Sequence, residues 1–301
     1  MQRWPRWPVV LAMSEWTRPR HLSEALDILA LDPGKYRVIS GGTDLMVERH
    51  LAPDRRPAYW LDISGIPELQ DIVITEQGIR IGAATPLGSI RRHPEVVARW
   101  PMLAASAAVT GAPPIQNRAT LGGNICNASP AADNSPVLLA YGARLEISRQ
   151  KESRILPYEA FHKGYRATAL QAGELLTAIW IPYPGNRSRS YFRKVGTRAA
   201  QAIAKVSIAA LIEETGDGSI RRACFGLASV AAMPCTLPSV SRYLAGRLLG
   251  EISETAVRHW VQKDIAPIKD IRSTAEYRLE VASRLVLEAI RMRSEIEKED
   301  M

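Results

Sequence analysis

The sequence predicts an α+β protein with two domains. Three observations lead to this: helical and strand-like segments alternate near the amino terminus, antiparallel hairpins follow them, and a proline-rich linker precedes a last group of strands and helices. The clearest linker is Pro182-Tyr183-Pro184-Gly185. With 301 residues, 46% of them hydrophobic and 23% charged, the chain has the length and composition of a globular protein with a sizeable core.

The first segments form an α/β unit, because helices and strands alternate along the chain. Apolar residues at helical spacing predict the first helix, and Ser23 is a suitable N-cap for it. The second helix follows a strand and a pair of glycines. The predicted order is helix (23–30), strand (36–40), glycine turn (41–42), helix (44–50) and strand (58–64).

The middle of the chain combines hairpin strands with a long loop. Two apolar segments flank a turn at Gln77-Gly78, which predicts an antiparallel hairpin. An alanine-rich segment predicts one long helix from about residue 95 to residue 109. Residues 111–136 are dense in Gly, Pro and Asn and lack regular periodicity, and long loops inside compact domains are usually functional. Further strands are expected at residues 143–148 and 174–182.

After the linker, strand-like segments predict an antiparallel sheet, with the tight turn Gly216-Asp217-Gly218 between the last two strands. These strands are expected at residues 190–195, 206–214 and 219–230. Two or three helices close the chain, and the last is expected from about residue 274 to residue 292. Four of its apolar residues recur at intervals of four and predict the face that packs on the sheet: Tyr277, Val281, Leu285 and Ala289. The second domain is therefore a sheet with helices on one side.

Composition and charge exclude several classes of protein. The net charge is +8, but the basic residues are scattered and aromatic residues, at 6%, do not interleave with them, so no nucleic-acid surface is expected. No segment approaches the roughly 20 apolar residues of a membrane span. The first residues lack the features of a signal peptide, so we expect a cytoplasmic protein. Residues 1–13 are interpreted as an extraneous extension, with Met13 a possible initiator.

The cysteine and histidine content indicates no metal site in this chain. Cys126, Cys224 and Cys235 form no CxxC motif, and an iron–sulfur cluster needs about four thiolates. Neither a metalloprotease HExxH motif nor a hydrolase GxSxG motif is present. No catalytic acid–base group or metal ligand is therefore predicted.

Two glycine pairs are the candidate binding site. One lies in Ser40-Gly41-Gly42-Thr43-Asp44, between a strand and a helix, and the other in Thr120-Leu121-Gly122-Gly123-Asn124, within the long loop. Glycine lets the backbone approach a ligand closely, and successive N–H groups form a concave site for anions. Neither pair fits GxGxxG or the P-loop motif, which argues against a Rossmann or ordinary ATPase site. The two turns predict a cofactor with a diphosphate, held from both sides.

Longer motifs resemble the flavoprotein subunits of the xanthine dehydrogenase and carbon monoxide dehydrogenase family of molybdenum hydroxylases. Residues 115–147 are similar to the family pattern IRNxATLGGN followed by ASPxxD, and ISGGTDL is similar to its first phosphate loop. The second domain carries KVGTR, AIAKVSIA and DIRSTAEYR. The similarity extends from about residue 14 to residue 291. Ordered motifs in both domains make the resemblance specific.

The resemblance implies a two-subdomain FAD-binding domain of the vanillyl-alcohol-oxidase (PCMH) type, followed by a C-terminal domain like that of the CO dehydrogenase flavoprotein. The implied limits are residues 14–185, with subdomains of about 14–66 and 67–185, and residues 186–301. It also implies noncovalent FAD and a cation, Lys205, beside its isoalloxazine ring. The implied cofactor-binding residues are Ser40, Gly41, Gly42, Thr43, Asp44, Leu45, Thr120, Leu121, Gly122, Gly123, Asn124, Asn127, Asp133 and Lys205.

The function implied is electron transfer through FAD to an external acceptor. A large molybdopterin subunit and a small subunit with two [2Fe–2S] clusters are the implied partners, in a dimer of heterotrimers. This chain departs from the family at Ala202, where an acidic residue is common, and at Thr110, where some members have an aromatic residue. The main alternative is a self-sufficient FAD-dependent oxidoreductase of the same cofactor fold, which the match in the second domain disfavours. A scaffold that has lost flavin is disfavoured by the intact glycine turns.

Overall fold

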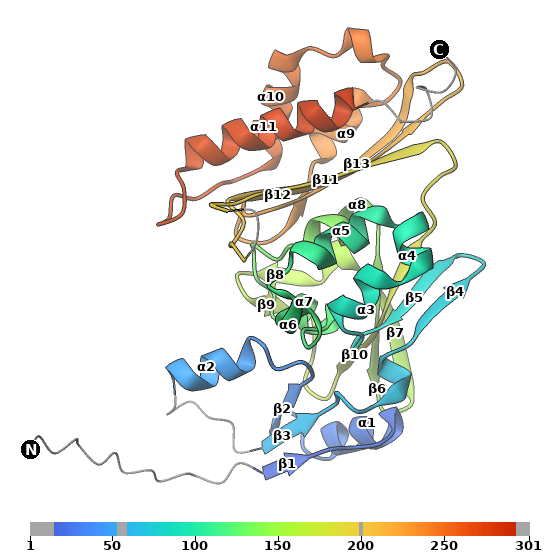
Figure 1. The fold of residues 1–301 in the computed structure, drawn as a ribbon, viewed down its shortest axis with the longest axis vertical. Helices are drawn as coiled ribbons and strands as arrows, with labels where there is room; N and C mark the ends of the chain where they lie inside the picture. Colours follow the sequence, from blue (N-terminus) through green and yellow to red (C-terminus); the bar gives the residue numbers. More distant parts are fainter. Residues whose placement is uncertain (1–14, 53–58, 199–200, 293–301) are drawn as a thin grey trace, which may run out of the picture.

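A computed structural model describes residues 15–52, 59–198 and 201–292. The chain forms three tiers along its longest axis: a small parallel sheet at one end, a larger antiparallel sheet with short helices in the middle, and a second antiparallel sheet with long helices at the other end (Figure 1). The α+β class is confirmed. The expected extension, residues 1–13, lies outside the described residues.

The first tier contains the predicted α/β unit and one strand that was not predicted, β1 (Glu15–Thr17). Its strands lie in the order β1, β3 (Tyr59–Asp62) and β2 (Tyr36–Ile39), and all are parallel. Helix α1 (Leu22–Leu31) buries Leu26 and Leu29 against Leu61 and Ile63. The predicted cap was wrong: His21 occupies the N-cap position, and the Glu24 carboxylate accepts a hydrogen bond from the Arg20 amide instead.

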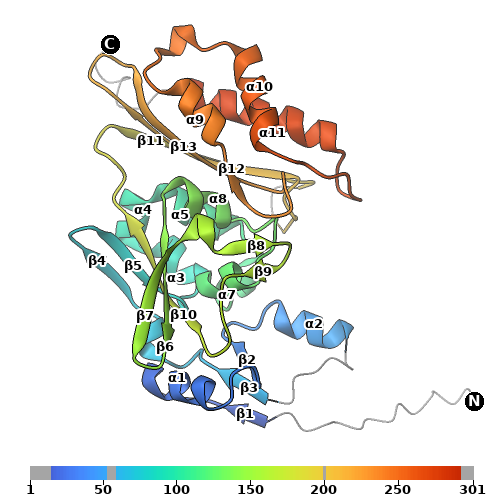
Figure 2. The ribbon, with the colours of Figure 1, turned by 180° about the vertical axis from the view of Figure 1, so that it is seen from behind.

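Helix α2 (Leu45–Leu51) differs from α1 because it buries no side chain. It extends away from the rest of the molecule in both ribbon views (Figures 1 and 2). The turn of 3₁₀ helix η2 (Pro67–Leu69) leads from the first tier to the second. Residues 40–44, between β2 and α2, lie at the junction of these tiers, where Gly41 packs closely against the carbonyl of Arg118.

The second tier is a five-stranded antiparallel sheet in the order β4-β5-β10-β6-β7. The predicted hairpin is β4 (Ile72–Thr75) with β5 (Gly78–Gly82), and the later strands are β6 (Arg144–Arg149), β7 (Glu152–Pro157) and β10 (Leu175–Pro182). A separate ribbon pairs β8 (His162–Gly164) with β9 (Ala167–Thr168) after the 3₁₀ turn η3 (Tyr158–Ala160). Strands β7, β8 and β9 were not predicted.

Short helices occupy two segments of this tier for which the sequence predicted one long helix and one long loop. The single helix expected at 95–109 was wrong: Trp100 separates α4 (Pro94–Arg99) from α5 (Pro101–Val109), because Pro101 has no amide hydrogen to continue α4. The loop expected at 111–136 also contains helices. The helices around the loop are α3 (Leu87–Arg92), α6 (Pro113–Gln116), α7 (Leu121–Cys126) and α8 (Ser135–Ala140).

The third tier is a four-stranded antiparallel sheet in the order β11-β12-β13-β14. Its strands are β11 (Ser188–Val195), β12 (Val206–Glu214), β13 (Ile220–Ala228) and β14 (Cys235–Thr236). Helices α9 (Pro238–Leu244), α10 (Glu254–Asp264) and α11 (Ala275–Arg291), with the 3₁₀ turn η4 (Leu249–Glu251), cover one face (Figure 2). The expected face of α11 was partly wrong: Leu285 and Ala289 are buried, whereas Tyr277 is 41% exposed.

The sheet of the third tier is buried on both faces. Along β12, Ile208 and Ala210 face the helices, whereas Ala209 and Leu211 join the core of the second tier. Gly226 of β13 allows this packing, because a Cβ atom there would overlap the carbonyl oxygen of Pro136 in α8. The second and third tiers therefore share one continuous apolar interface.

The described part of the chain contains neither a candidate membrane-spanning helix nor a cluster of possible metal ligands. None of its helices is long and apolar enough to cross a bilayer. Among the same residues, no group of three or more His, Cys, Asp or Glu side chains is placed to hold a metal ion.

Candidate cofactor-binding site

A cavity of about 400 Å³ lies where the first and second tiers meet, and both predicted glycine turns line it. This volume lies within the roughly 300–1,000 Å³ that is typical of small-molecule sites. The predicted residues that line the cavity are Ser40, Gly41, Gly42, Thr43, Asp44, Leu45, Thr120, Gly122, Gly123, Asn124 and Asn127. Other segments contribute Arg37, Thr110, Cys126, Thr168 and Glu174.

The first turn offers main-chain donors to a ligand. The amides of residues 41–45 make no hydrogen bond to another group within the described ranges, although the carbonyls of Gly42 and Asp44 accept the first bonds of α2. Gly42 has φ of +72°, a conformation that suits glycine and turns successive N–H groups to one side. The buried hydroxyl oxygen of Ser40 also has no partner among these residues. This turn therefore fits an anion with several oxygen acceptors.

The second turn does not offer the free amides that the sequence led us to expect for binding an anion. Its amides are already bonded within the protein: Leu121 N–H donates to Thr85 O, Gly122 N–H to Ala83 O at 2.9 Å, and Gly123 N–H to the Thr120 hydroxyl at 3.1 Å. The Thr120 side chain is the N-cap of α7. This turn therefore shapes the cavity and presents side chains, rather than a row of free amides.

Three glycines of the turns have different steric roles. A Cβ atom at Gly41 would overlap the carbonyl oxygen of Arg118, and one at Gly122 would lie 2.5 Å from the carbonyl oxygen of Ala83. At Gly123, a Cβ atom would approach only the Thr120 hydroxyl, at 2.9 Å. Gly41 and Gly122 are thus needed for close backbone packing, whereas Gly123 leaves space in the cavity.

Charged groups near the first turn have opposite signs. Burial is the main cause that raises the pKa of the Asp44 carboxyl, the nearby Glu48 raises it further, and Arg166 opposes this rise. Arg166 pairs with Glu48 at 2.9 Å, and Arg37 lies 4.0 Å from the other oxygen of that carboxylate. Arg37 was not predicted, although a cation on the strand that leads into a glycine turn is a signal in the sequence. It places positive charge at the cavity.

Cys126 lies at the carboxyl end of α7 and also lines the cavity. The residue is exposed to solvent, and desolvation by the neighbouring protein groups raises the pKa of its thiol. Protein groups thus replace much of the water around this thiol. A thiol in this environment is predominantly protonated at neutral pH.

Three predicted residues do not line the cavity. Leu121 is fully buried in the core of the second tier. Lys205 lies on the helix side of the third tier, with its ammonium 5.2 Å from the centre of the Tyr277 ring. Asp133 is also outside the lining, but it makes a buried ion pair.

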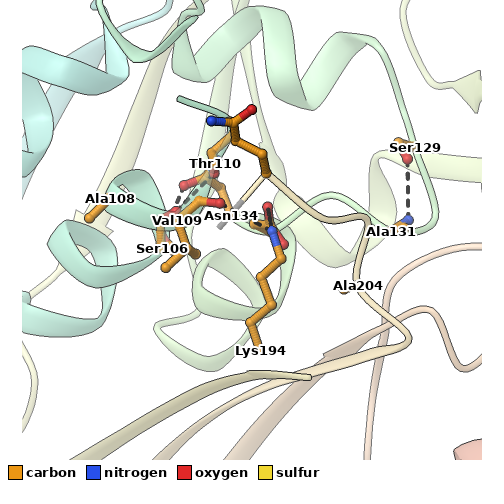
Figure 3. Close-up of polar contacts among 12 residues, drawn as sticks. Ser106, Ala108, Val109, Thr110, Ser129, Ala131, Asn134, Lys194 and Ala204 are labelled. Atoms are coloured by element: carbon orange, nitrogen blue, oxygen red, sulfur yellow. Dashed lines mark hydrogen bonds and ion pairs between the residues drawn. The ribbon is translucent and has the colours of Figure 1, made fainter. Parts of the chain in front are cut away.

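The ion pair joins Asp133 to Lys194 of β11, with 2.6 Å between Nζ and Oδ2 and each side chain about 10% exposed. Lys194 extends from the sheet to the carboxyl end of α5, where Nζ also donates to Val109 O at 3.1 Å (Figure 3). Burial raises the pKa of the Asp133 carboxyl to about 6, against the opposing effect of Lys194. The sequence prediction missed Lys194, which connects the third tier to the cavity region.

Family models match both parts of the chain. Residues 12–184 match the FAD binding domain in molybdopterin dehydrogenase, and residues 190–292 match the CO dehydrogenase flavoprotein C-terminal domain. These ranges cover most of the chain. They place the cavity within the first match.

Individual relatives agree with these models. The chain is 31% identical over 280 residues to the putative xanthine dehydrogenase FAD-binding subunit XdhB of Escherichia coli K12, covering 92% of this chain and 94% of that one. It is 28% identical over 284 residues to the carbon monoxide dehydrogenase medium chain of Afipia carboxidovorans, covering 92% and 95%. Carbon monoxide dehydrogenase from Hydrogenophaga pseudoflava shares the fold, with a TM-score of 0.85 at 25% identity and coverage of 92% and 96%. The chain therefore belongs to the FAD-binding medium-subunit family of the xanthine and carbon monoxide dehydrogenases, which are oxidoreductases.

Proposed function

We propose that this chain binds FAD noncovalently in the cavity between its glycine turns and transfers electrons from [2Fe–2S] clusters of a partner subunit to an external acceptor. The observation that supports this most strongly is that residues 41–45, whose amides make no hydrogen bond within the described ranges, line a cavity inside the part of the chain that matches the FAD-binding domain. A diphosphate has the anionic oxygens that such amides bind. When bound, FAD supplies a redox centre that accepts electrons and passes them on.

Different residues of the cavity would contact different parts of the cofactor. The amides from Gly41 to Leu45 would hold the diphosphate, and Ser40 would donate its free hydroxyl to the same ligand. Gly123 would leave room for the ligand, while Asn124 and Asn127 would reach its polar groups. Leu121 would act through packing, and Asp133 through its pair with Lys194. A direct role of Lys205 at the flavin would require its side chain to leave Tyr277.

The proposed partners are a large molybdopterin subunit and a small iron–sulfur subunit, in a dimer of heterotrimers. Support comes from relatives that are named as medium chains or FAD-binding subunits of larger dehydrogenases. In this arrangement the organic or gaseous substrate is oxidised in another subunit. This chain then needs only to hold a redox cofactor and to meet its partners.

The test of cofactor binding uses a pair of glycine variants. Gly123→Val should abolish FAD retention, because the added side chain enters the cavity; the nearest atom to its Cβ is the Thr120 hydroxyl oxygen at 2.9 Å, and no backbone atom lies as close. Gly65→Val is the matched control, since a side chain there meets no atom within 4 Å. FAD affinity is measured from quenching of flavin fluorescence, and circular dichroism checks the fold of each variant. Equal FAD affinity in the folded Gly123→Val variant and the wild type would refute the placement.

The proposed noncovalent attachment and the electron route have separate tests. Acid precipitation of the loaded protein should leave a yellow supernatant, whereas a yellow pellet would show a covalent flavin. Purification from the native host should yield a molybdopterin subunit and an iron–sulfur subunit with this chain. Rapid-mixing spectroscopy should then show that substrate reduces the flavin only in the complex. Reduction in the isolated chain would favour the self-sufficient oxidoreductase.

A further inference from the structure

Asn134 is a fully buried amide beside the cavity, and its surroundings are polar. It occupies the N-cap position of α8, yet its side chain makes no cap hydrogen bond. Instead, Oδ1 accepts from the Ser106 hydroxyl at 2.9 Å, and Nδ2 donates to Thr110 Oγ1 at 3.3 Å and to Asn124 Oδ1 at 3.2 Å (Figure 3). Its amide hydrogens thus go to Thr110 and Asn124, and both of these residues line the cavity.

The direction of these hydrogen bonds follows from Thr110. The Thr110 hydroxyl donates its only hydrogen to the carbonyl oxygen of Ser106, at 2.8 Å. Its oxygen then accepts from the NH₂ group of Asn134, which places Asn134 Oδ1 at the Ser106 hydroxyl; that hydroxyl has one hydrogen for two acceptors, Asn134 Oδ1 at 2.9 Å and Leu103 O at 3.1 Å. The same NH₂ group meets Asn124, so the side-chain oxygen of Asn124 must face Asn134. The Ser106 carbonyl thus fixes the orientation of the Thr110 hydroxyl. This hydroxyl orients the amide of Asn134, which in turn orients that of Asn124.

The NH₂ group of Asn124 points away from Asn134, because the oxygen of the same amide faces Asn134. Because its oxygen is held by Asn134, its NH₂ group is the half left for a ligand, and it makes no other hydrogen bond within the described ranges. We propose that Asn134 is a positioning residue that presents Asn124 to the cofactor as a hydrogen-bond donor. The acceptor would be an oxygen atom of the cofactor, either of its diphosphate or of its flavin ring. This inference rests on the proposed function for the identity of that cofactor.

A purely structural role would have different consequences. If Asn134 only filled space, an isosteric side chain would preserve binding whatever its hydrogen-bonding pattern. If it orients Asn124, the ability to donate decides the result. Asn134→Asp keeps the shape and removes both donated hydrogen bonds when the carboxyl is ionised. Asn124 would then turn its NH₂ group towards the new carboxylate and its oxygen towards the cavity.

The experiment measures FAD affinity of the purified full-length chain by flavin fluorescence quenching, over a range of pH. For Asn134→Asp, the dissociation constant should exceed that of the wild type by about tenfold or more at high pH. The ratio should fall as the pH is lowered, because a protonated carboxyl regains one of the two donors, its O–H group. Asn134→Leu has no donor in either form, so its affinity should be lower at every pH. Asn186→Asp carries the same charge change on an exposed residue of the linker, outside the cavity, and should leave affinity unchanged.

A double-mutant cycle separates action through Asn124 from general damage. In the Asn124→Ala background, Asn134→Asp should cause no further loss of affinity, because the donor that it orients is already gone. Equal losses in both backgrounds would overturn the inference, as would wild-type affinity in both Asn134 variants. Either result leaves the proposed function standing if the wild type binds FAD. A wild-type chain that binds no FAD overturns the proposed function and this inference together.

Discussion

Replacing Lys194 by methionine should destabilise the chain, because it leaves the Asp133 carboxylate buried without its cation. The two charged atoms are 2.6 Å apart and both side chains are about 10% exposed. Removing one partner of such a buried pair costs about 3–5 kcal/mol. Loss of the bond from Lys194 to Val109 O adds about 1 kcal/mol.

Protonation of Asp133 limits this cost. Its pKa is already about 6 with Lys194 present, so removal of the ammonium raises the pKa further and the carboxyl is more readily neutralised at pH 7. We therefore expect a net loss of about 2–4 kcal/mol in the free energy of unfolding.

Urea denaturation at pH 7 of Lys194→Met, Asp133→Asn and the double variant measures the effect. The double variant should be more stable than the sum of the single effects by at least about 1 kcal/mol, since it contains no unpaired charge. Additive effects, or a Lys194→Met variant within about 0.5 kcal/mol of the wild type, would contradict the reasoning. Either result would show that the ion pair contributes little to the free energy of unfolding.

Further predictions concern Gly41, Asp133 and Cys126. Gly41→Ala should weaken FAD binding and lower the melting temperature, because its Cβ atom overlaps the Arg118 carbonyl oxygen; unchanged values in differential scanning fluorimetry and titration would contradict this. Folding raises the pKa of Asp133 to about 6, so the free energy of unfolding of the wild type, compared with that of Asp133→Asn, should fall as pH rises from about 4 to about 6. If the difference between the two free energies stays constant over that range, Asp133 does not titrate there. Iodoacetamide should modify Cys126 slowly at pH 8, because little thiolate forms, and bound FAD should slow the modification further. Peptide mass spectrometry detects the adduct. Equal rates of modification with and without FAD would place the ligand elsewhere.

Elements with strong periodicity were predictable from the sequence. Strand β12 was placed at residues 206–214, as observed, because a nearly continuous apolar segment is bounded by polar residues and a turn. The parallel unit around β2 and β3 was likewise predictable from the order of its segments. In these regions local sequence and burial agree.

Short elements were not predictable because they carry too few residues for a period. Helix α6 has 4 residues and α7 has 6, so the loop between α5 and α8 resembled irregular structure. Strand β9, with 2 residues, depends on pairing with β8 rather than on its own sequence. The break at Trp100 had a local signal, Pro101, which outweighs the helical propensity of the alanines around it.

The site shows the same division between local and distant information. The first glycine turn was predictable because a strand, a glycine pair and a helix follow one another. The pairing of Asp133 with Lys194 spans 61 residues and joins separate tiers, so no local pattern indicates it. The internal bonding of the second turn was also hidden, because the acceptors of its amides at Thr85 and Ala83 lie on another segment.

The contact between Gly41 and the Arg118 carbonyl has a consequence for biosynthesis. The walls of the cavity come from segments far apart in the chain, so the proposed FAD site is complete only when both segments have packed together. A nascent or truncated polypeptide would therefore stay colourless until both tiers have docked. Flavin retention at the proposed site would therefore report the docking of the first and second tiers.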